Sequence, residues 1–380
     1  MTESDADFLS SSRLRDQVPG SLGWQLIVAG FAHRFFDPFG PQRAKFAKSV
    51  GEPLTDTPFE GWAAGVFLRL LQQMGIQPGS ATSVTRLLAA MERAGLLLSA
   101  GWDARFPVLG QRYVSQGVLS HQRQGYLWLA EAIGPELIIN AFRSVTVQIS
   151  ATESPHWGSG LVLDEAHIIT NKHVAEELMG KGLQIVMPMF GAEREPVLGQ
   201  SLEVFLHPEV DVAVIQVRPS VEGNLQALKG MVFRDPAWAD EVYVLGYPRV
   251  AWTVDSGITL QRGEVVLPMA EVPRRRDEKM EPWDTPGRTN VFLYSAIARP
   301  GNSGGPIVAH DGRVIGIVVE DSAHTPSSNP EADGGGESVV GSVLSEAAPF
   351  YQGIPASELM RALEFFGLQH LITIEDPLNL

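Results

Sequence analysis

Apolar residues recur at helical spacing through the first third of the chain, over residues 23–139. The pattern predicts a helix over residues 57–75. Thr57 can cap its start, Pro58 suits the first helical position, and Gly75 can adopt the left-handed conformation that ends a helix.

Further helices are predicted over residues 83–94 and 125–132. Between them, residues 96–98 and 112–119 could form short strands, which would give a winged-helix arrangement. A plain helical bundle fits the same pattern nearly as well. On either interpretation, residues 1–140 are expected to form a mostly helical N-terminal domain.

After Phe142 the pattern changes to short β-branched segments separated by turn residues, which is typical of an all-β barrel or sandwich. Asp311-Gly312 predicts a tight hairpin turn, and residues 357–366 predict a closing helix. Residues 272–289 and 321–337, rich in Pro, Ser, Gly or charge, predict long loops. The strands are expected at residues 144–149, 160–163, 167–170, 183–187, 212–217, 241–245, 263–267, 291–295, 306–309 and 314–319. Residues 141–370 are therefore expected to form a β-rich domain, giving an α+β fold for the whole chain.

The composition narrows the class of protein. The 380 residues contain no cysteine, and MTESDADFLSSS lacks the basic and apolar regions of a signal peptide, so we expect an unexported, cytoplasmic protein that does not span a membrane. Residues 1–144 hold 13 Lys and Arg against 12 Asp and Glu, whereas the remainder holds 16 against 32. An acidic C-terminal part makes nonspecific nucleic-acid binding unlikely there.

The strongest chemical signal is a serine in a glycine-rich turn, Pro300-Gly301-Asn302-Ser303-Gly304-Gly305-Pro306. Such a turn can expose the hydroxyl of Ser303 while neighbouring backbone N–H groups converge. The N–H groups of Gly301 and Ser303 would then form an oxyanion hole.

Two upstream residues fit the roles of its partners. His173 follows a predicted strand, where it can act as a general base toward a serine, and it is preferred over His156, His167 and His207 for that reason. Asp211 leads directly into an apolar strand, and a carboxylate entering a core needs a partner such as the Nδ1–H of His173.

With these three residues in the order His, Asp, Ser, the chain resembles the trypsin-like serine peptidases, most closely their bacterial HtrA-type branch. The resemblance covers roughly residues 144–366. It is carried by GSGLVLDEAHIITNKHV, HPEVDVAVIQV, YVLGYPRV, ITLQRGEVV, AIARPGNSGGPIV and GRVIGIVV.

The resemblance implies a chymotrypsin-like double β-barrel, a His173–Asp211–Ser303 triad and serine endopeptidase activity on proteins or peptides. It also implies a substrate cleft edged by Val319, Glu320 and Asp321, with Ile297 and Tyr351 near the primary specificity pocket. The chain departs from the HtrA pattern in two respects. No peptide-binding PDZ module follows the protease segment, and the stretch before the serine is one residue longer.

Alternative functions remain open at this point. The barrel could be an inactive binding module, or residues 83–119 could bind DNA as a winged helix. No metal or other cofactor is expected, because the chain has no HExxH motif, no cysteine and no phosphate-binding glycine loop followed by lysine. Residues 1–140 are expected to regulate or target the peptidase, through a partner protein if they bind one.

Overall fold

The computed structural model describes residues 17–54, 60–75, 81–117, 120–187, 196–197, 202–218, 225–250, 257–273, 287–319 and 350–375. The chain divides into two compact units, residues 1–137 and 138–380. None of the helices in these described ranges has the length and apolar character needed to cross a bilayer.

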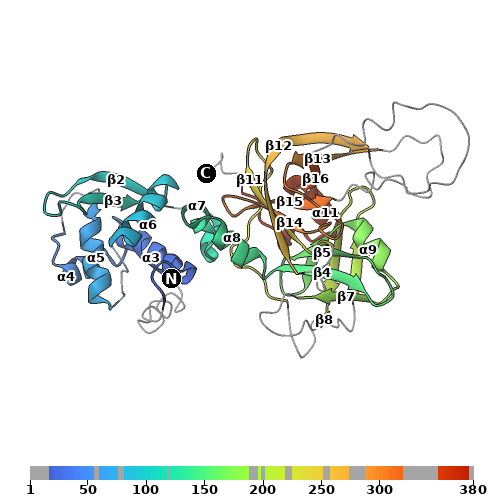
Figure 1. The fold of residues 1–380 in the computed structure, drawn as a ribbon, viewed down its shortest axis with the longest axis horizontal. Helices are drawn as coiled ribbons and strands as arrows, with labels where there is room; N and C mark the ends of the chain where they lie inside the picture. The colour runs from blue at the N-terminus through green and yellow to red at the C-terminus, as the bar shows by residue number, and fades with distance from the viewer. Residues whose placement is uncertain are drawn as a thin grey trace, which may run out of the picture. The chain divides into compact units, whose positions relative to one another are not determined.

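The N-terminal unit combines helices with a three-stranded antiparallel sheet in the order β1-β3-β2 (Figure 1). The sheet excludes a plain helical bundle. The connectivity helix, strand, two helices, two strands from α3 to β3 is that of a winged helix, with α4 as an addition. The elements are α3 (Leu22–Phe35), α4 (Arg43–Val50), β1 (Trp62–Ala63), α5 (Ala64–Gln73), α6 (Ala81–Arg93), β2 (Leu97–Trp102), β3 (Gln111–Ser115), η1 (His121–Gln124), η2 (Leu127–Leu129) and α7 (Ala130–Ile133).

An aromatic cluster forms the core of this unit. Phe35 lies within 6 Å of the rings of Phe46, Trp62 and Phe67, with centroid distances of 5.7, 4.8 and 5.2 Å. The apolar face expected on α6 is buried, since Val84, Leu87, Leu88 and Met91 all point into the core. Helix α8 (Pro135–Phe142) then carries the chain across the boundary between the two units.

One helix of this unit begins later than the sequence suggested. Trp62 and Ala63 form a strand that pairs with Tyr113 and Arg112, so α5 starts at Ala64. Glu60 is therefore outside the helix, and the expected capping residues Thr57 and Pro58 fall outside the described residues. The expected end is confirmed, because Gly75 has a φ of +70°.

The C-terminal unit contains two antiparallel sheets. The first has seven strands in the order β8-β7-β4-β5-β6-β10-β9, and the second is a closed barrel in the order β11-β12-β13-β16-β15-β14. The strands of the first sheet are β4 (Thr146–Ala151), β5 (Trp157–Val162), β6 (His167–Thr170), β7 (Leu183–Val186), β8 (Pro196–Val197), β9 (Leu202–Leu206) and β10 (Ala213–Val217). The barrel strands are β11 (Glu241–Gly246), β12 (Thr259–Pro273), β13 (Arg288–Tyr294), β14 (Pro306–Ala309), β15 (Val314–Val319) and β16 (Tyr351–Pro355). The expected α+β fold with a β-rich C-terminal part is confirmed.

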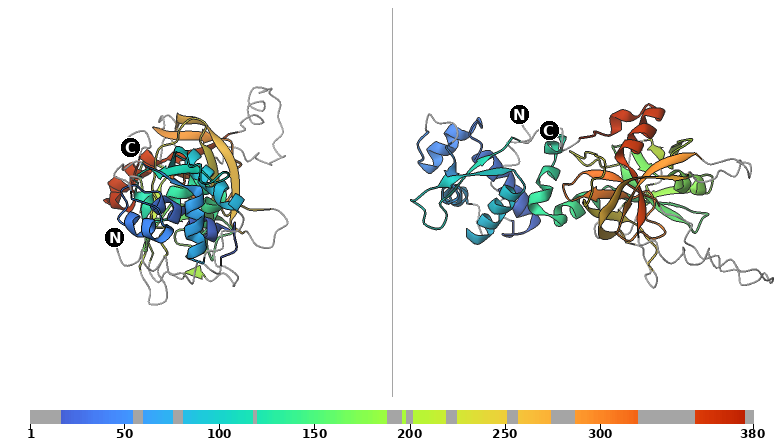
Figure 2. Two further views of the ribbon diagram at one scale, coloured as in Figure 1. Left: turned by 90° about the vertical axis from the view of Figure 1, so that its left-hand side faces the viewer. Right: turned by 90° about the horizontal axis from the view of Figure 1, so that it is seen from above.

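Helices accompany the strands in the described part of this unit, and a short 3-10 helix, η4 (Gln369–Leu371), follows the last of them. The short helix α9 (Lys172–Leu178) follows β6, and α11 (Ala356–Phe366) follows β16 and lies at one side of the strands (Figure 2). The aromatic residue Phe366 of α11 lies 5.9 Å from Phe205 of β9, so this helix contacts the first sheet as well as following the barrel.

Several strand limits differ from expectation. Strand β12 runs on to Pro273 and β13 begins at Arg288, so the expected loop over residues 272–289 is strand at both ends, with Val272 paired to Thr289. Strands β8, β9 and β16 had no counterpart in the expected set. The expected loop over residues 321–337 falls outside the described residues.

A buried ion-pair network fastens the end of the described chain to the barrel. Arg234 binds Asp240 at 2.7 Å and Asp311 at 2.8 Å, and Arg313 links Asp311 to Glu375, each at 3.3 Å. Backbone bonds of 2.8 Å join Phe233 to residues 373 and 375 in the same place. The turn at Asp311-Gly312 forms as expected, with a φ of +77° at Gly312.

Candidate active site

Strand pairing brings His173 and Asp211 together. Strand β6 ends just before His173 and β10 begins just after Asp211. The two strands are antiparallel, with Ala213 opposite Thr170. The end of one strand therefore lies beside the start of the other, and the two side chains meet at that edge of the sheet.

The contact between His173 and Asp211 uses both carboxylate oxygens. The backbone N–H of His173 donates to Asp211 Oδ1 at 2.9 Å, and the ring Nδ1 of His173 lies 2.7 Å from Asp211 Oδ2. The side chain of Asn171 also donates to the backbone oxygen of Asp211, at 3.1 Å. These bonds fix the imidazole so that Nδ1 faces the carboxylate and Nε2 faces away from it.

The turn that carries Ser303 is held by hydrogen bonds on both sides. Ser159 of β5 is fully buried, and its hydroxyl donates to the carbonyl of Gly301 at 2.7 Å and accepts the N–H of Tyr247 at 2.9 Å. The N–H of Ser159 donates to the carbonyl of Ser303 at 2.8 Å, and the N–H of Gly304 donates to Val318 O at 3.0 Å. The turn is thus fixed between the first sheet and the barrel.

Glycine is required in this turn for steric reasons. Gly301 has a φ of +99°, and a Cβ there would collide with the carbonyl of Tyr247. Gly304 has a φ of +82°, and a Cβ there would lie 3.1 Å from the backbone N of Asn171. The serine turn therefore packs against the segment that leads directly into His173.

The opposite flank of His173 also lies near the serine. A Cβ on Gly158 would meet the side chain of Val174 at 2.6 Å and the carbonyl oxygen of Ser303 at 3.2 Å. Gly158 thus allows the residue after His173 and the backbone of Ser303 to approach the same point. The structure brings together the elements that carry His173, Asp211 and Ser303.

The expected substrate-contacting residues are only partly described. Val319 ends β15 opposite Gln352 of β16, which makes it a neighbour of Tyr351. The ring of Tyr351 lies 6.2 Å from that of Tyr294, whose pKa is raised by complete burial. Ile297 is 45 % exposed between buried alanines. Glu320 and Asp321 lie outside the described residues.

Sequence reasoning missed two supporting residues. Ser159 was visible only as part of Gly158-Ser159-Gly160, whose glycines gave the sole signal. From the sequence, His207 was only a competitor for the role of general base, and no pattern indicated its supporting role. It is 4 % exposed, and its Nδ1 accepts the N–H groups of Glu209 and Val210 at 3.1 and 2.8 Å. Burial lowers the pKa of His207. These bonds shape the turn that delivers Asp211.

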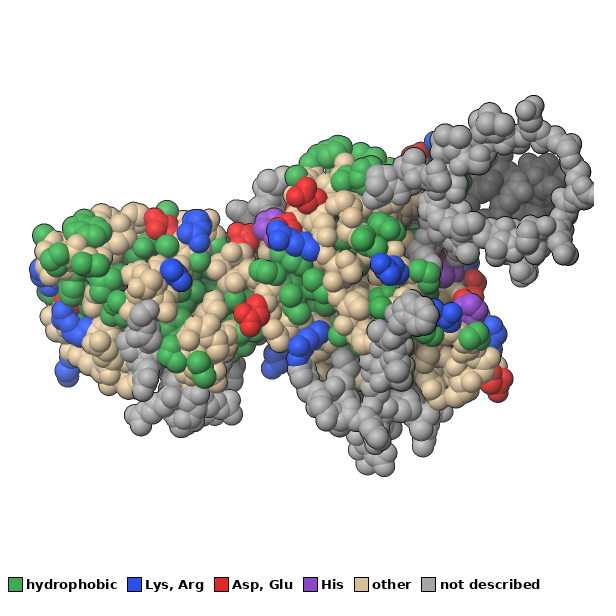
Figure 3. Space-filling model, in the orientation of Figure 1, with side chains coloured by type: hydrophobic (Ala, Val, Ile, Leu, Met, Phe, Trp, Pro, Cys, Tyr) green, Lys and Arg blue, Asp and Glu red, His purple; other side chains and the backbone are tan. Residues whose placement is uncertain are grey.

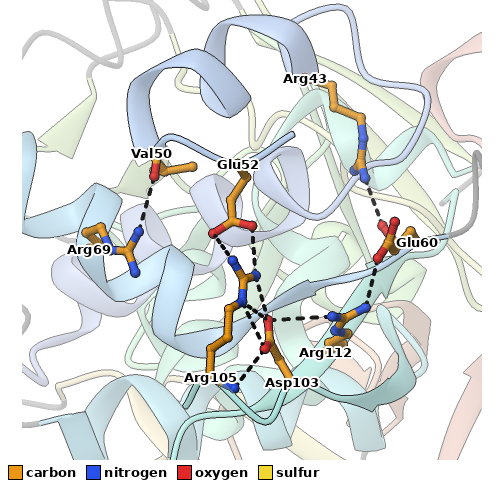
Figure 4. Close-up of polar contacts among 8 residues, drawn as sticks. All are labelled: Arg43, Val50, Glu52, Glu60, Arg69, Asp103, Arg105 and Arg112. Atoms are coloured by element: carbon orange, nitrogen blue, oxygen red, sulfur yellow. Dashed lines mark hydrogen bonds and ion pairs between the residues drawn. The ribbon is translucent and has the colours of Figure 1, made fainter. Parts of the chain in front are cut away.

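A cavity of about 210 Å³ in the N-terminal unit also gathers ionisable side chains (Figure 4). Arg105 donates to Asp103 at 2.7 Å and to Glu52 at 2.8 Å, and Arg112 lies between Glu60 at 3.0 Å and Asp103 at 3.6 Å. Each of the three carboxylates in this cavity is paired with one of its two arginines, and no serine or histidine lines it. The cluster fastens the β2–β3 hairpin to the α4–β1 segment, which is a structural role.

No group of His, Cys, Asp and Glu in the described part of the chain has the arrangement needed to hold a metal ion.

Comparison with known proteins gives one family match and several structural likenesses. Residues 158–317, which include all three expected triad positions, match the family model of the trypsin-like peptidase domain. No curated protein matches the chain.

The solved structures that resemble the chain include two that their titles call proteases and one titled Deg5. The Rv3671c protease from M. tuberculosis in its active form is 21 % identical, with a TM-score of 0.41, over 60 % of this chain and 82 % of that one. The serine endoprotease from Yersinia pestis is 17 % identical, with a TM-score of 0.39, over 62 % and 66 %. Deg5 is 19 % identical, with a TM-score of 0.40, over 60 % and 90 %. The family match identifies residues 158–317 as a trypsin-like peptidase domain, which is the domain of a serine endopeptidase.

Proposed function

We propose that this chain cleaves peptide bonds in proteins through a triad of Ser303, His173 and Asp211. The observation that carries the proposal is the His173–Asp211 pair, in which the backbone N and the ring Nδ1 of His173 lie 2.9 and 2.7 Å from the two carboxylate oxygens. The glycine-rich serine turn packs against both flanks of His173. In this assignment Ser303 is the nucleophile, His173 is the general base and acid, and Asp211 orients and stabilises His173.

The reaction would proceed in two halves. Ser303 Oγ attacks the scissile carbonyl carbon while His173 Nε2 takes the hydroxyl proton, and the N–H groups of Gly301 and Ser303 stabilise the oxyanion. His173 then returns the proton to the leaving amine, and an acyl-enzyme remains on Ser303. Water, deprotonated by His173, hydrolyses this ester. Asp211 stays ionised and stabilises the imidazolium of His173 in both halves.

Labelling with a fluorophosphonate probe tests the nucleophile. We expect the full chain to be labelled and Ser303→Ala to lose labelling while keeping its circular dichroism spectrum. The matched control is Ser357→Ala, which removes an exposed serine hydroxyl at the start of α11 and should leave labelling intact. Labelling that persists in Ser303→Ala would contradict the assignment.

His173→Ala and Ser303→Ala should each abolish peptide hydrolysis, and the double variant should be no worse than either, because the two side chains act in one proton transfer. Additive losses in the double variant would show that the residues act in separate steps.

We also propose that the N-terminal unit regulates or targets the peptidase through a protein partner. The N-terminal unit has its own aromatic core, and the arginines in the cavity described above are paired with carboxylates of the same unit. On the face shown in Figure 3, its Lys and Arg side chains stand apart, with apolar and uncharged residues between them. This spacing favours a protein partner over nucleic acid, which is bound by clustered basic side chains.

Truncation before Pro135 tests this second proposal. Helix α8 starts there, and its residues Ile138 and Phe142 are buried, so residues 135–380 keep the helix whole. Altered activity or partner dependence in this fragment supports regulation, whereas soluble fragment with unchanged activity and targeting contradicts it.

A further inference from the structure

A tryptophan and an arginine lie at one border of the serine turn, in positions that the catalytic assignment does not use. A Cβ on Gly301 would lie 2.9 Å from Nε1 of Trp157, so the indole abuts the turn. The indole N–H donates to the carbonyl of Tyr247 at 2.7 Å, which fixes the ring. The guanidinium of Arg249 stacks on this ring, with its carbon 4.4 Å from the ring centroid.

Arg249 is held at both ends. Its backbone N–H donates to the carbonyl of Pro300 at 2.9 Å, next to Gly301, and its terminal Nη2 donates to the carbonyl of Pro155. The residue is exposed, and no carboxylate in the described ranges forms an ion pair with it. The result is a fixed, exposed positive charge beside the turn that would hold the scissile carbonyl.

The geometry distinguishes the two sides of the turn. On one side, Gly304 donates to Val318 of the barrel strand β15. On the other side, Trp157 begins β5, and the adjacent Gly158 lies between Val174 and the carbonyl of Ser303. Trp157 is therefore the neighbour of a residue that lies beside Val174, directly after His173, the residue assigned to protonate the departing amine.

The departing part of the substrate continues from that amine. Because the proposed mechanism has the amine leave next to the imidazole, the residues that follow the scissile bond would run toward the start of β5 and the Trp157–Arg249 stack. The acyl part runs the other way, along the barrel strand. A guanidinium beside the leaving segment attracts a carboxylate there and repels a cation.

We propose that Arg249 makes the enzyme prefer protein substrates with an acidic side chain within the first two residues after the scissile bond. This inference rests on the proposed endopeptidase function and adds a substrate class to it. The Trp157 ring restricts the guanidinium, so little side-chain entropy is lost when the carboxylate binds.

Quenched fluorescent peptides test the preference. Their acyl-side sequence is taken from a cleavage site that the full-length enzyme makes in casein, identified by mass spectrometry. Each of the first two positions after the bond carries Glu, Gln or Lys in turn. We expect kcat/KM for the better Glu peptide to exceed that of its Gln partner by about two- to fivefold at low salt, the range of exposed ion pairs. The Lys peptide should be slower than both, and 0.5 M NaCl should shrink the differences.

Charge variants locate the effect. Arg249→Met keeps a side chain that packs on the indole and should bring the Glu-to-Gln ratio to about one. Arg249→Glu should invert the preference in favour of Lys. The matched control Arg288→Met removes an exposed arginine at the start of β13 and should keep the wild-type ratio.

The outcomes distinguish a failure of the Arg249 preference from a failure of the endopeptidase function. A protein that is labelled by fluorophosphonate and cleaves the peptides with a Glu-to-Gln ratio of one at both positions, or keeps its ratio in Arg249→Met, overturns the inference alone. A protein that is neither labelled nor active overturns the proposed function and this inference with it.

Discussion

The turn before Asp211 depends on a single buried imidazole, so replacing His207 should affect both stability and catalysis. The two backbone N–H groups of Glu209 and Val210 point at His207 Nδ1, which must therefore be the acceptor, with the ring proton on Nε2. The ring of Phe365 in α11 packs edge-on against His207 at 4.9 Å. The His207→Ala substitution removes the acceptor and leaves the N–H groups without it.

The expected magnitude follows from those two bonds. Each buried N–H left without an acceptor costs about 1–3 kcal/mol, and partial rescue by water places the total near 2–4 kcal/mol of unfolding free energy. A shift of about 1 Å in Asp211 would misalign His173 and lower kcat/KM by about 100-fold. His207→Asn should restore most of both losses, because an Asn side-chain oxygen can accept N–H groups two or three residues ahead.

The pH dependence gives a second signature. Burial, reinforced by the charge of Arg361, lowers the pKa of His207, so the folded state favours the neutral ring. The stability that this contributes is fully present above the ordinary value of about 6.5 and is lost as pH falls from there toward the lower folded pKa. In wild-type protein the backbone N–H groups of the Asp211 turn should therefore become less protected from hydrogen exchange below about pH 6.5. In His207→Asn this protection should persist.

Hydrogen exchange and kinetics together check this prediction. Hydrogen exchange of the peptide spanning residues 206–218 is followed at pH 7.5 and 5.5 in proteins that also carry Ser303→Ala, which avoids self-digestion. The value of kcat/KM is measured in proteins that retain Ser303. His370→Ala, which removes an exposed histidine, is the control. Unchanged exchange and unchanged kcat/KM in His207→Ala would refute the reasoning.

Three further substitutions have defined outcomes. Gly301→Ala should lower kcat by about 100-fold or more, the effect of losing one oxyanion donor, with circular dichroism unchanged. Arg234→Met should lower the free energy of urea unfolding by about 3–5 kcal/mol, because Asp240 remains buried without its partner. Hydrogen bonds from Arg105 hold the pKa of Asp103 at about 2, so the stability from this pair is present above about pH 3.9 and lost as pH falls toward 2. Arg105→Ala should reduce this pH dependence of the unfolding free energy. It should lower the unfolding free energy at pH 7 by about 1 kcal/mol, since Arg105 is 56 % exposed and water screens the pair.

The features of the site that could be predicted from sequence are those with strong local signals. A backbone position with positive φ, such as Gly301, is recognisable in the sequence as a glycine because other residues are strained there. His173 follows a recognisable apolar strand and Asp211 precedes one, and their order along the chain before Ser303 was what suggested the pair.

The features that could not be predicted from the sequence depend on contacts between distant parts of the chain. Trp157 bonds to Tyr247 across 90 residues, and Arg249 reaches Pro155 across 94. No spacing rule connects such positions, and the cation on the leaving side could not be found before the sheets were placed together. The two-residue strand at Trp62 was missed for the same reason, because its partner Tyr113 lies far along the chain and helical periodicity dominates locally.

The closure of the barrel has a consequence for the order in which the protein matures during synthesis. Strand β11 pairs with β12 and β14, but the barrel closes only when β16 joins β13 to β15 and residues 373–375 bond to Phe233. These segments leave the ribosome after every other barrel strand, whereas the N-terminal unit can fold as soon as it emerges. At translation rates of about 5–20 residues per second, the interval between β11 and β16 is roughly 5–20 s. We expect the nascent chain to carry a folded N-terminal unit and an unfinished catalytic unit throughout that interval, so that a growing polypeptide is not exposed to its own peptidase before translation has passed β16.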